Sequence, residues 1–113
     1  MPELPEVETV KNGIAAFSGK AKVLSLEVRN RRFREIVPED IESRLVGAKI
    51  VGYSRIGKYI VINFDNKISV IWHLGMSGRI KTFKVKPDIL EKHDHIILQT
   101  TAGYLVYNDP RRF

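Results

Sequence analysis

The most reactive group in this sequence lies at its N-terminus, where Met1 precedes Pro2 and Glu3. Proline after the initiator normally allows Met1 to be removed, which leaves Pro2 as a free secondary amine. An α-amino group has a pKa near about 8, roughly two units below that of lysine, so part of it is neutral near neutral pH. Attack of this amine on a sugar C1′ or an aldehyde gives an iminium, an electron sink for elimination, with Glu3 as general acid and base.

The same residues also suit an ordinary helix start. Pro2 and Pro5 pre-set the backbone of a first helical turn, and Glu3 and Glu6 complement the helix dipole. From the residues alone, both interpretations stay open.

A second candidate is Lys58, which lies between Gly57 and Tyr59 at the junction of two strand-like runs. A lysine that points into a cleft at such a junction contacts a phosphate or donates a proton. The alternative is a solvated turn lysine, which is the commoner case.

Residues 73–79 read His-Leu-Gly-Met-Ser-Gly-Arg and follow an apolar strand. The two glycines predict a tight loop that pushes Met76 outward. An exposed apolar wedge beside basic residues fits insertion between DNA base steps. The alternative is a plain turn in which Met76 folds back and fills the core.

Two further segments carry candidate binding residues. His93 and His95 are spaced to share one face of a strand, with Asp94 on the other face. They suit a metal, a phosphate or a hydrogen-bonded strand start, and no third metal ligand is evident. After the turn at Asp109-Pro110, Arg111 and Phe113 project as groups that pair with or stack on bases, or form a frayed basic tail.

The elements that must position these residues are two helices and a set of strands. Apolar residues with helical spacing and acids in the first turns predict a helix from about residue 3 to 17, and Pro38 and Gly47 bracket a short one over 39–45. Alternating or apolar runs predict strands over 23–28, 49–56, 59–64, 68–74, 79–83, 95–100 and 104–107. The fold class is therefore α+β, an antiparallel β-sandwich with an N-terminal helix and a second short helix.

Composition narrows the function classes. The chain has 113 residues, no cysteine, and 19 Lys+Arg against 13 Asp+Glu, for a net charge of +6. The missing cysteine excludes a disulfide framework, a thiol nucleophile and any Cys-based metal site. The positive excess, which includes the arginine-rich run over 29–34, favours nucleic acid as a partner. The acidic N-terminus and the short apolar runs predict a cytoplasmic protein without a signal peptide or membrane span.

Four blocks together carry a resemblance: residues 1–9, 73–78, 92–95 and 109–113. In this order they closely resemble the N-terminal domain of the bacterial formamidopyrimidine-DNA glycosylases, and the resemblance covers essentially the whole chain. It implies a bifunctional base-excision repair enzyme that removes oxidised purines, such as 8-oxoguanine and formamidopyrimidines, from duplex DNA. The enzyme then cuts the abasic strand by β- and δ-elimination.

The resemblance also implies roles for single residues. Pro2 is implied as the nucleophile that forms a Schiff base at C1′, Glu3 as its acid–base partner, and Lys58 as a phosphate contact that assists elimination. The substrate and DNA contacts that it implies are Glu6 near the damaged nucleotide, His93 on the DNA backbone, and Met76, Arg111 and Phe113 in the gap left by the flipped nucleotide.

Full-length members of the family continue with a helix–two-turn–helix module and a zinc finger that needs cysteines. The resemblance therefore implies that residues 1–113 form a single, truncated catalytic N-terminal domain with no cofactor of its own, zinc belonging to a module that this sequence lacks. The expected partner is damaged double-stranded DNA, and the expected state is a monomer in the bacterial cytoplasm. The alternatives are an endonuclease VIII-like enzyme for oxidised pyrimidines and a non-catalytic DNA-binding or structural fragment.

Overall fold

The computed structural model describes residues 4–29, 40–75 and 77–110. Its helices are α1 (Leu4–Ser18) and α2 (Ile41–Leu45). Its strands are β1 (Val23–Val28), β2 (Ile50–Ile56), β3 (Tyr59–Phe64), β4 (Ser69–His73), β5 (Arg79–Phe83), β6 (Asp94–Thr100) and β7 (Gly103–Asn108).

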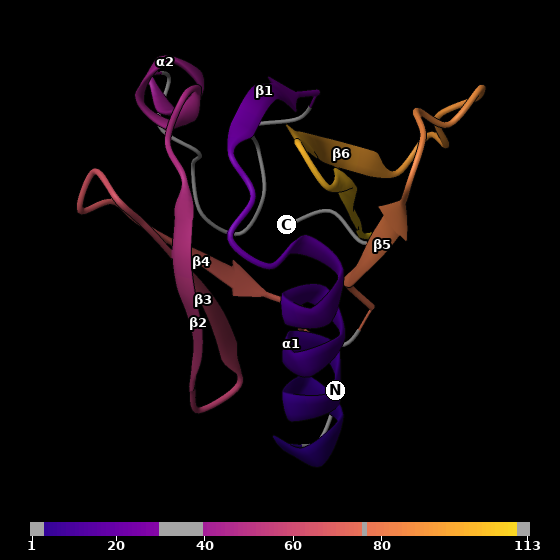
Figure 1. The fold of residues 1–113 in the computed structure, drawn as a ribbon. Helices are drawn as coiled ribbons and strands as arrows, with labels where there is room; N and C mark the ends of the chain where they lie inside the picture. The colour runs from indigo at the N-terminus through magenta and orange to yellow at the C-terminus, as the bar shows by residue number, and fades with distance from the viewer. Residues whose placement is uncertain (1–3, 30–39, 76, 111–113) are drawn as a thin grey trace.

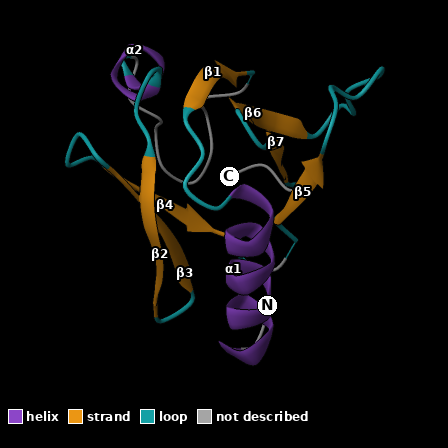
Figure 2. Ribbon diagram, in the orientation of Figure 1, coloured by secondary structure: helices purple, strands orange, loops and turns teal. Residues whose placement is uncertain are grey.

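The strands form two antiparallel sheets. One has the order β1-β6-β7-β5, and the other has the order β2-β3-β4. Figure 1 shows the two sheets on opposite sides of the molecule, with the C-terminal half of α1 between them, and Figure 2 shows the same layers by element type. The three-stranded sheet is a run of consecutive hairpins. The four-stranded sheet instead places β1 beside β6, which is distant in the sequence.

The core between the layers is built from alternate strand residues and one face of α1. Ile60 and Ile62 in β3 and Leu105 in β7 are completely buried. Val7 and Ile14 bring the apolar face of α1 into the same cluster. Each fully buried side chain of this kind contributes roughly 1.5–3 kcal/mol of transfer free energy, so this cluster holds α1 against both sheets.

The predicted fold class is confirmed, with small differences at the ends of elements. Each predicted helix and strand has a counterpart; half of the bounds agree and the others differ by one or two residues, as is common at the ends of elements. Gly19 follows α1 with φ 53° and Gly47 follows α2 with φ 91°, so both occupy the left-handed C-terminal position expected from the sequence.

The start of β6 adds a detail that the sequence did not indicate. Asp94 was expected on the face of the strand opposite His93 and His95, and its side chain is buried in a polar network. Only 2% of Asp94 is exposed. Among the described residues, no helix is both long enough and apolar enough to cross a membrane.

Candidate functional site

The structure describes three of the predicted site residues, Glu6, Lys58 and His93. The others, Pro2, Glu3, Met76, Arg111 and Phe113, lie outside the described residues, and their roles stay predictions. The segments that lead into them are described, and direct contacts link those segments to one another.

The first link joins α1 to the turn that carries Lys58. The Arg55 guanidinium donates from Nε to Oε1 of Glu8 at 2.9 Å and from Nη1 to the carbonyl oxygen of Gly57 at 2.8 Å. Glu8 also pairs with Lys11 at 3.0 Å. The hydrogen bond from Lys11, followed by that from Arg55, holds the pKa of Glu8 below its usual value. Arg55 thus ties the β2–β3 turn to the helix that begins two residues after Pro2.

The turn itself is a tight connection between β2 and β3. Gly57 has φ 58°, a left-handed conformation that side chains rarely adopt, and it places the half-buried Lys58 at the tip. Figure 1 shows this turn at the same end of the molecule as the start of α1. Tyr59 next to it stacks against His73, with ring centroids 4.8 Å apart, so the turn also lies beside the loop that follows β4.

The loop after β4 is closed by its glycines. Gly75 has φ 63°, and the Gly78 N–H donates to the Leu74 carbonyl oxygen at 2.7 Å. Leu74 is buried and anchors the loop in the core. A Cβ at position 78 would overlap the Leu74 carbonyl oxygen and lie 3.0 Å from the Tyr107 hydroxyl. The tight turn predicted for this segment is therefore present. Position 78 must be glycine because the Leu74 carbonyl oxygen lies too close to leave room for a Cβ.

Gly78→Ala is expected to lower the free energy of unfolding by about 2 kcal/mol, because the added methyl group has no space and the loop must move. Urea denaturation of the purified chain measures this change. Gly13→Ala is the matched control, since a Cβ there meets no atom within 4 Å, and it is expected to be neutral or stabilising. A Gly78→Ala protein as stable as the wild type would contradict the required close approach.

His93 and His95 lie side by side at the start of β6, with ring centroids 6.1 Å apart. His95 is buried, and its Nε2 donates to the Asp109 carbonyl oxygen at 2.7 Å, while the Asp109 N–H donates to the His93 carbonyl oxygen at 3.1 Å. His93 is half-buried at the surface. Within the described residues, no group of three or more His, Asp and Glu side chains could hold a metal ion. The geometry is that of the hydrogen-bonded strand start, with His93 half-buried at the surface.

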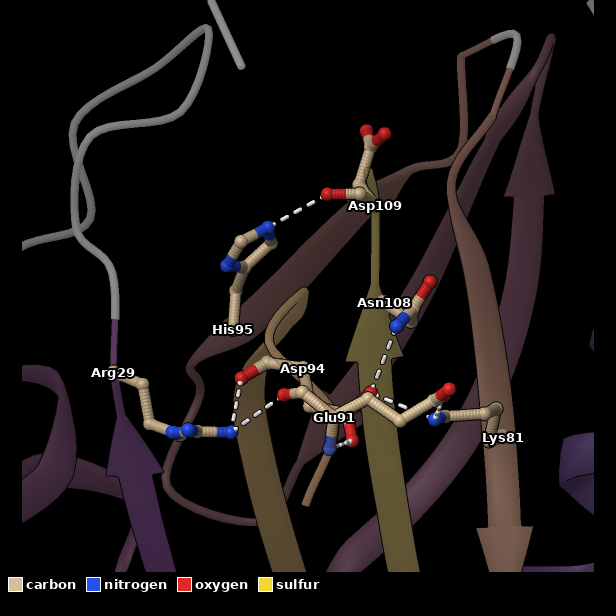
Figure 3. A network of polar contacts seen from close by, with 7 residues as sticks. All are labelled: Arg29, Lys81, Glu91, Asp94, His95, Asn108 and Asp109. Carbon is tan, nitrogen blue, oxygen red and sulfur yellow. Dashed lines mark hydrogen bonds and ion pairs between the residues drawn. The ribbon is translucent and has the colours of Figure 1, made fainter. Parts of the chain in front are cut away.

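A polar network around the buried Asp94, shown in Figure 3, holds this strand start in place. The Asp94 carboxylate accepts from Lys81 Nζ at 2.7 Å, from Asn108 Nδ2 at 2.9 Å and from the Glu91 N–H at 2.7 Å. The Lys81 ammonium also pairs with Glu91. Arg29 Nη1 donates to the carbonyl oxygens of Glu91 and Asp94, each at 3.0 Å.

The network sets the charge of its members. Burial opposes ionisation of Asp94, but the hydrogen bonds from Lys81, Asn108 and the Glu91 backbone outweigh it and hold its pKa below the usual value. Burial likewise opposes the charge on Lys81, and the bonds to Asp94 and Glu91 outweigh it and raise the pKa of Lys81. Both groups are therefore charged near neutral pH.

The sequence did not indicate the contacts that join these segments, which are made chiefly by Arg55, Lys81, Asp94 and Asp109. Asp109 was interpreted only as half of a turn, and Lys81 was not singled out. The available signal was weak: Asp94 and Asp109 stand next to candidate residues, but their partners are far along the chain.

Comparisons with known proteins agree with this arrangement. The sequence pattern of the formamidopyrimidine-DNA glycosylase N-terminal domain matches residues 1–113. The formamidopyrimidine-DNA glycosylase of Zymomonas mobilis is 45% identical over all of this chain, which spans 41% of that relative's length. The formamidopyrimidine-DNA glycosylase of Acinetobacter baumannii is also 45% identical over all of this chain, which spans 40% of that relative's length.

Solved structures give the same result. The Lactococcus lactis formamidopyrimidine-DNA glycosylase, bound non-covalently to DNA that contains an AP site, matches with a TM-score of 0.89 at 34% identity, over 99% of this chain and 43% of that one. The same enzyme in complex with DNA that contains FAPY-dG matches with a TM-score of 0.87 at 33% identity, over 98% and 42% of the two chains.

The fold and its glycine-closed loop beside the β2–β3 turn therefore define a class, the N-terminal domain of a DNA glycosylase. The chain belongs to the formamidopyrimidine-DNA glycosylase N-terminal domain family.

Proposed function

We propose that this domain serves a base-excision repair DNA glycosylase with AP lyase activity, which removes 8-oxoguanine and formamidopyrimidines from duplex DNA. The observation that carries the proposal is the double contact of Arg55, which binds α1 at Glu8 and the Lys58 turn at Gly57. It joins the helix that follows the candidate nucleophile to the turn that carries the candidate phosphate-binding lysine. The relatives bound to AP-site and FAPY-dG DNA point to the same substrate class.

In the proposed reaction, the neutral Pro2 amine attacks C1′ of the damaged nucleotide. The bond from C1′ to the base breaks, the base leaves with a proton, and the amine loses its own proton to give a neutral aminal at C1′. Glu3 then donates a proton to O4′ as the C1′–O4′ bond breaks, which opens the sugar and leaves the cationic iminium. Glu3 later accepts the protons that the eliminations release. Loss of a proton from C2′ then sends electrons toward the iminium as the C3′–O bond breaks. A second elimination releases the 5′ phosphate, and water hydrolyses the adduct.

Other residues bind the DNA around this step. Lys58 at the tip of its turn contacts a phosphate beside the lesion, and Glu6 in the first turn of α1 lies near the damaged nucleotide. His93 contacts the DNA backbone from the surface of the β6 start. The Glu6 side chain is exposed, and those of Lys58 and His93 are half-buried, so DNA can reach all three.

Met76, Arg111 and Phe113 are proposed to fill the hole in the duplex. Extruding a nucleotide costs a few kcal/mol of lost stacking and pairing. A thioether, a guanidinium and a phenyl ring offer stacking area and hydrogen bonds to the orphaned base.

The proposed partner is damaged double-stranded DNA, bound by a monomer in the bacterial cytoplasm. The cysteines that the zinc finger of the family needs are absent from this chain, so we place zinc outside residues 1–113. The isolated chain is expected to bind DNA weakly, because its net charge of +6 supplies few phosphate contacts.

Incubation of the chain with an abasic duplex and borohydride tests the proposal. Reduction of the iminium is expected to leave a covalent protein–DNA adduct that gel electrophoresis detects. Mass spectrometry must first verify that Met1 has been removed, because a retained Met1 converts the Pro2 amine to an amide. Absence of an adduct from the processed chain would contradict the activity and favour a non-catalytic fragment. Stronger release of an oxidised pyrimidine than of 8-oxoguanine from matched duplexes would favour an endonuclease VIII-like enzyme.

A further inference from the structure

Asp109 joins three segments that are distant in the sequence. Its backbone is held by the two contacts to His93 and His95 described above, and Figure 3 shows the one from His95. Its carboxylate faces a different segment. Oδ1 accepts a hydrogen bond from the Ser77 hydroxyl at 2.5 Å, across 32 positions of sequence. Only 6% of Asp109 is exposed, so the carboxylate makes these bonds largely shielded from water.

A second hydroxyl reaches the same carboxylate. The Tyr107 hydroxyl lies 3.2 Å from Oδ2 of Asp109 and 3.1 Å from the His73 carbonyl oxygen. A phenol has one proton, so the two acceptors share it. Tyr107 therefore ties the first residue of the loop over 73–78 to Asp109, while Ser77 ties the far side of that loop to it.

These bonds lie next to the residues that the proposed function places in the DNA gap. Ser77 directly follows Met76, and Asp109 comes two positions before Arg111. The two segments come from different places in the chain, and the backbones of Ser77 and Asp109, both described, are not hydrogen-bonded to each other. The side-chain bridge from Ser77, together with the contact of Tyr107 with His73, connects the loop over 73–78 to the end of β7.

Resting on the proposed function, we propose that Asp109 is a positioning residue. Its carboxylate, through Ser77 and Tyr107, sets the distance between the Met76 loop and the segment over 111–113, so that the side chains of both enter one gap in the duplex. Hydrogen bonds to a buried carboxylate are stronger than neutral ones, and a carboxylate has two oxygens that serve two donors at once. Alanine at position 109 serves neither donor.

The test compares two duplexes that differ only in one nucleotide, which is intact in one and a stable tetrahydrofuran abasic analogue in the other. Fluorescence anisotropy gives the dissociation constant of each, and their ratio measures the preference for a duplex with a gap to fill. For Ser77→Ala we expect this preference to fall about tenfold, because the bridge is lost, while binding to the intact duplex stays within about twofold. The loop itself is expected to stay closed through the bond from Gly78 to Leu74.

Asp109→Ala is a second variant and is expected to lose at least as much preference. Thr100→Val is the matched control. Its hydroxyl is also buried, donates to the Gly103 carbonyl oxygen at 2.9 Å and lies at the opposite end of β6 and β7. It is expected to lower thermal stability without changing the preference.

The outcomes separate this inference from the proposed function. Failure of the wild-type chain to form the trapped adduct contradicts the function and the inference together. A wild-type chain that forms the adduct, with Ser77→Ala keeping the full preference, overturns the positioning role alone. The positioning role is also overturned if the wild-type chain shows no preference for the gapped duplex. It is overturned as well if Thr100→Val loses as much of that preference as Ser77→Ala.

Discussion

Pro2→Ala is expected to form at least about tenfold less borohydride-trapped adduct with an abasic duplex than the wild-type chain. The variant keeps an N-terminal amine with a similar pKa, so basicity does not explain the loss. A secondary amine gives an iminium that is cationic without protonation, whereas the imine of a primary amine must gain a proton to accept electrons. The proline ring also restricts how the amine approaches C1′, and lost orientation is costly in rate.

The measurement is the initial rate of adduct formation at saturating protein, on gels, after mass spectrometry has verified removal of Met1. Pro5→Ala is the matched control, because Pro5 is the other proline at the start of the helix, is exposed and makes no covalent bond in the proposed mechanism. Its rate is expected to stay within about twofold of the wild type. Equal rates for Pro2→Ala and the wild type would remove Pro2 from the reaction.

Lys81→Met is expected to lower the free energy of unfolding by about 3 kcal/mol. Methionine fills nearly the same volume, so the loss comes from charge. Among the described residues, the Asp94 carboxylate would stay buried with Asn108 and the Glu91 N–H as its partners. Asp94→Asn is expected to cost less, since it leaves the partly exposed Lys81 with Glu91 and water. Urea denaturation measures both, with the exposed Lys86→Met as control, expected within about 0.5 kcal/mol.

The same pair predicts a pH dependence. The pKa of Asp94 is lower in the folded chain than in the unfolded one. Its contribution is therefore complete above the ordinary aspartate value of about 3.9 and is lost as pH falls through the lowered folded value. The raised pKa of Lys81 makes its contribution complete below about 10.4, and that contribution is lost as pH rises through the folded value. The stability gap between wild type and Lys81→Met should be full near about pH 7 and narrow near about pH 2. A gap that does not change with pH would exclude the ion pair as its cause.

The local pattern was sufficient for the elements and for the family. Val7 and Ile14 recur at helical spacing, and both are buried as that spacing requires. Gly19 and Gly47 marked the ends of the helices, because a left-handed residue is a local property of the chain. The site blocks at residues 73–78 and 109–113 were recognisable because their residues are contiguous in the sequence.

Single residues within those blocks were harder to interpret. Gly78 was expected in a turn, but the reason it must be glycine is the Leu74 carbonyl oxygen, which only the folded loop brings near. His93 and His95 were open to a metal, a phosphate or a strand start until the bond from His95 to Asp109 linked His95 to the end of β7.

Periodicity, turn residues and contiguous motifs are encoded locally, so the sequence was sufficient to predict the elements, the α+β class and the family. The sequence does not indicate which polar groups meet in the folded chain: Arg55 with Glu8, Lys81 with Asp94, and Ser77 with Asp109. These partners depend on strand order and register, because β5, β6 and β7 lie side by side only after the sheet has formed. That order results from packing of the whole core, and no local pattern contains it. The composition and the net charge of +6 indicate a DNA partner. Only the long-range contacts of the folded chain place the charged residues relative to one another.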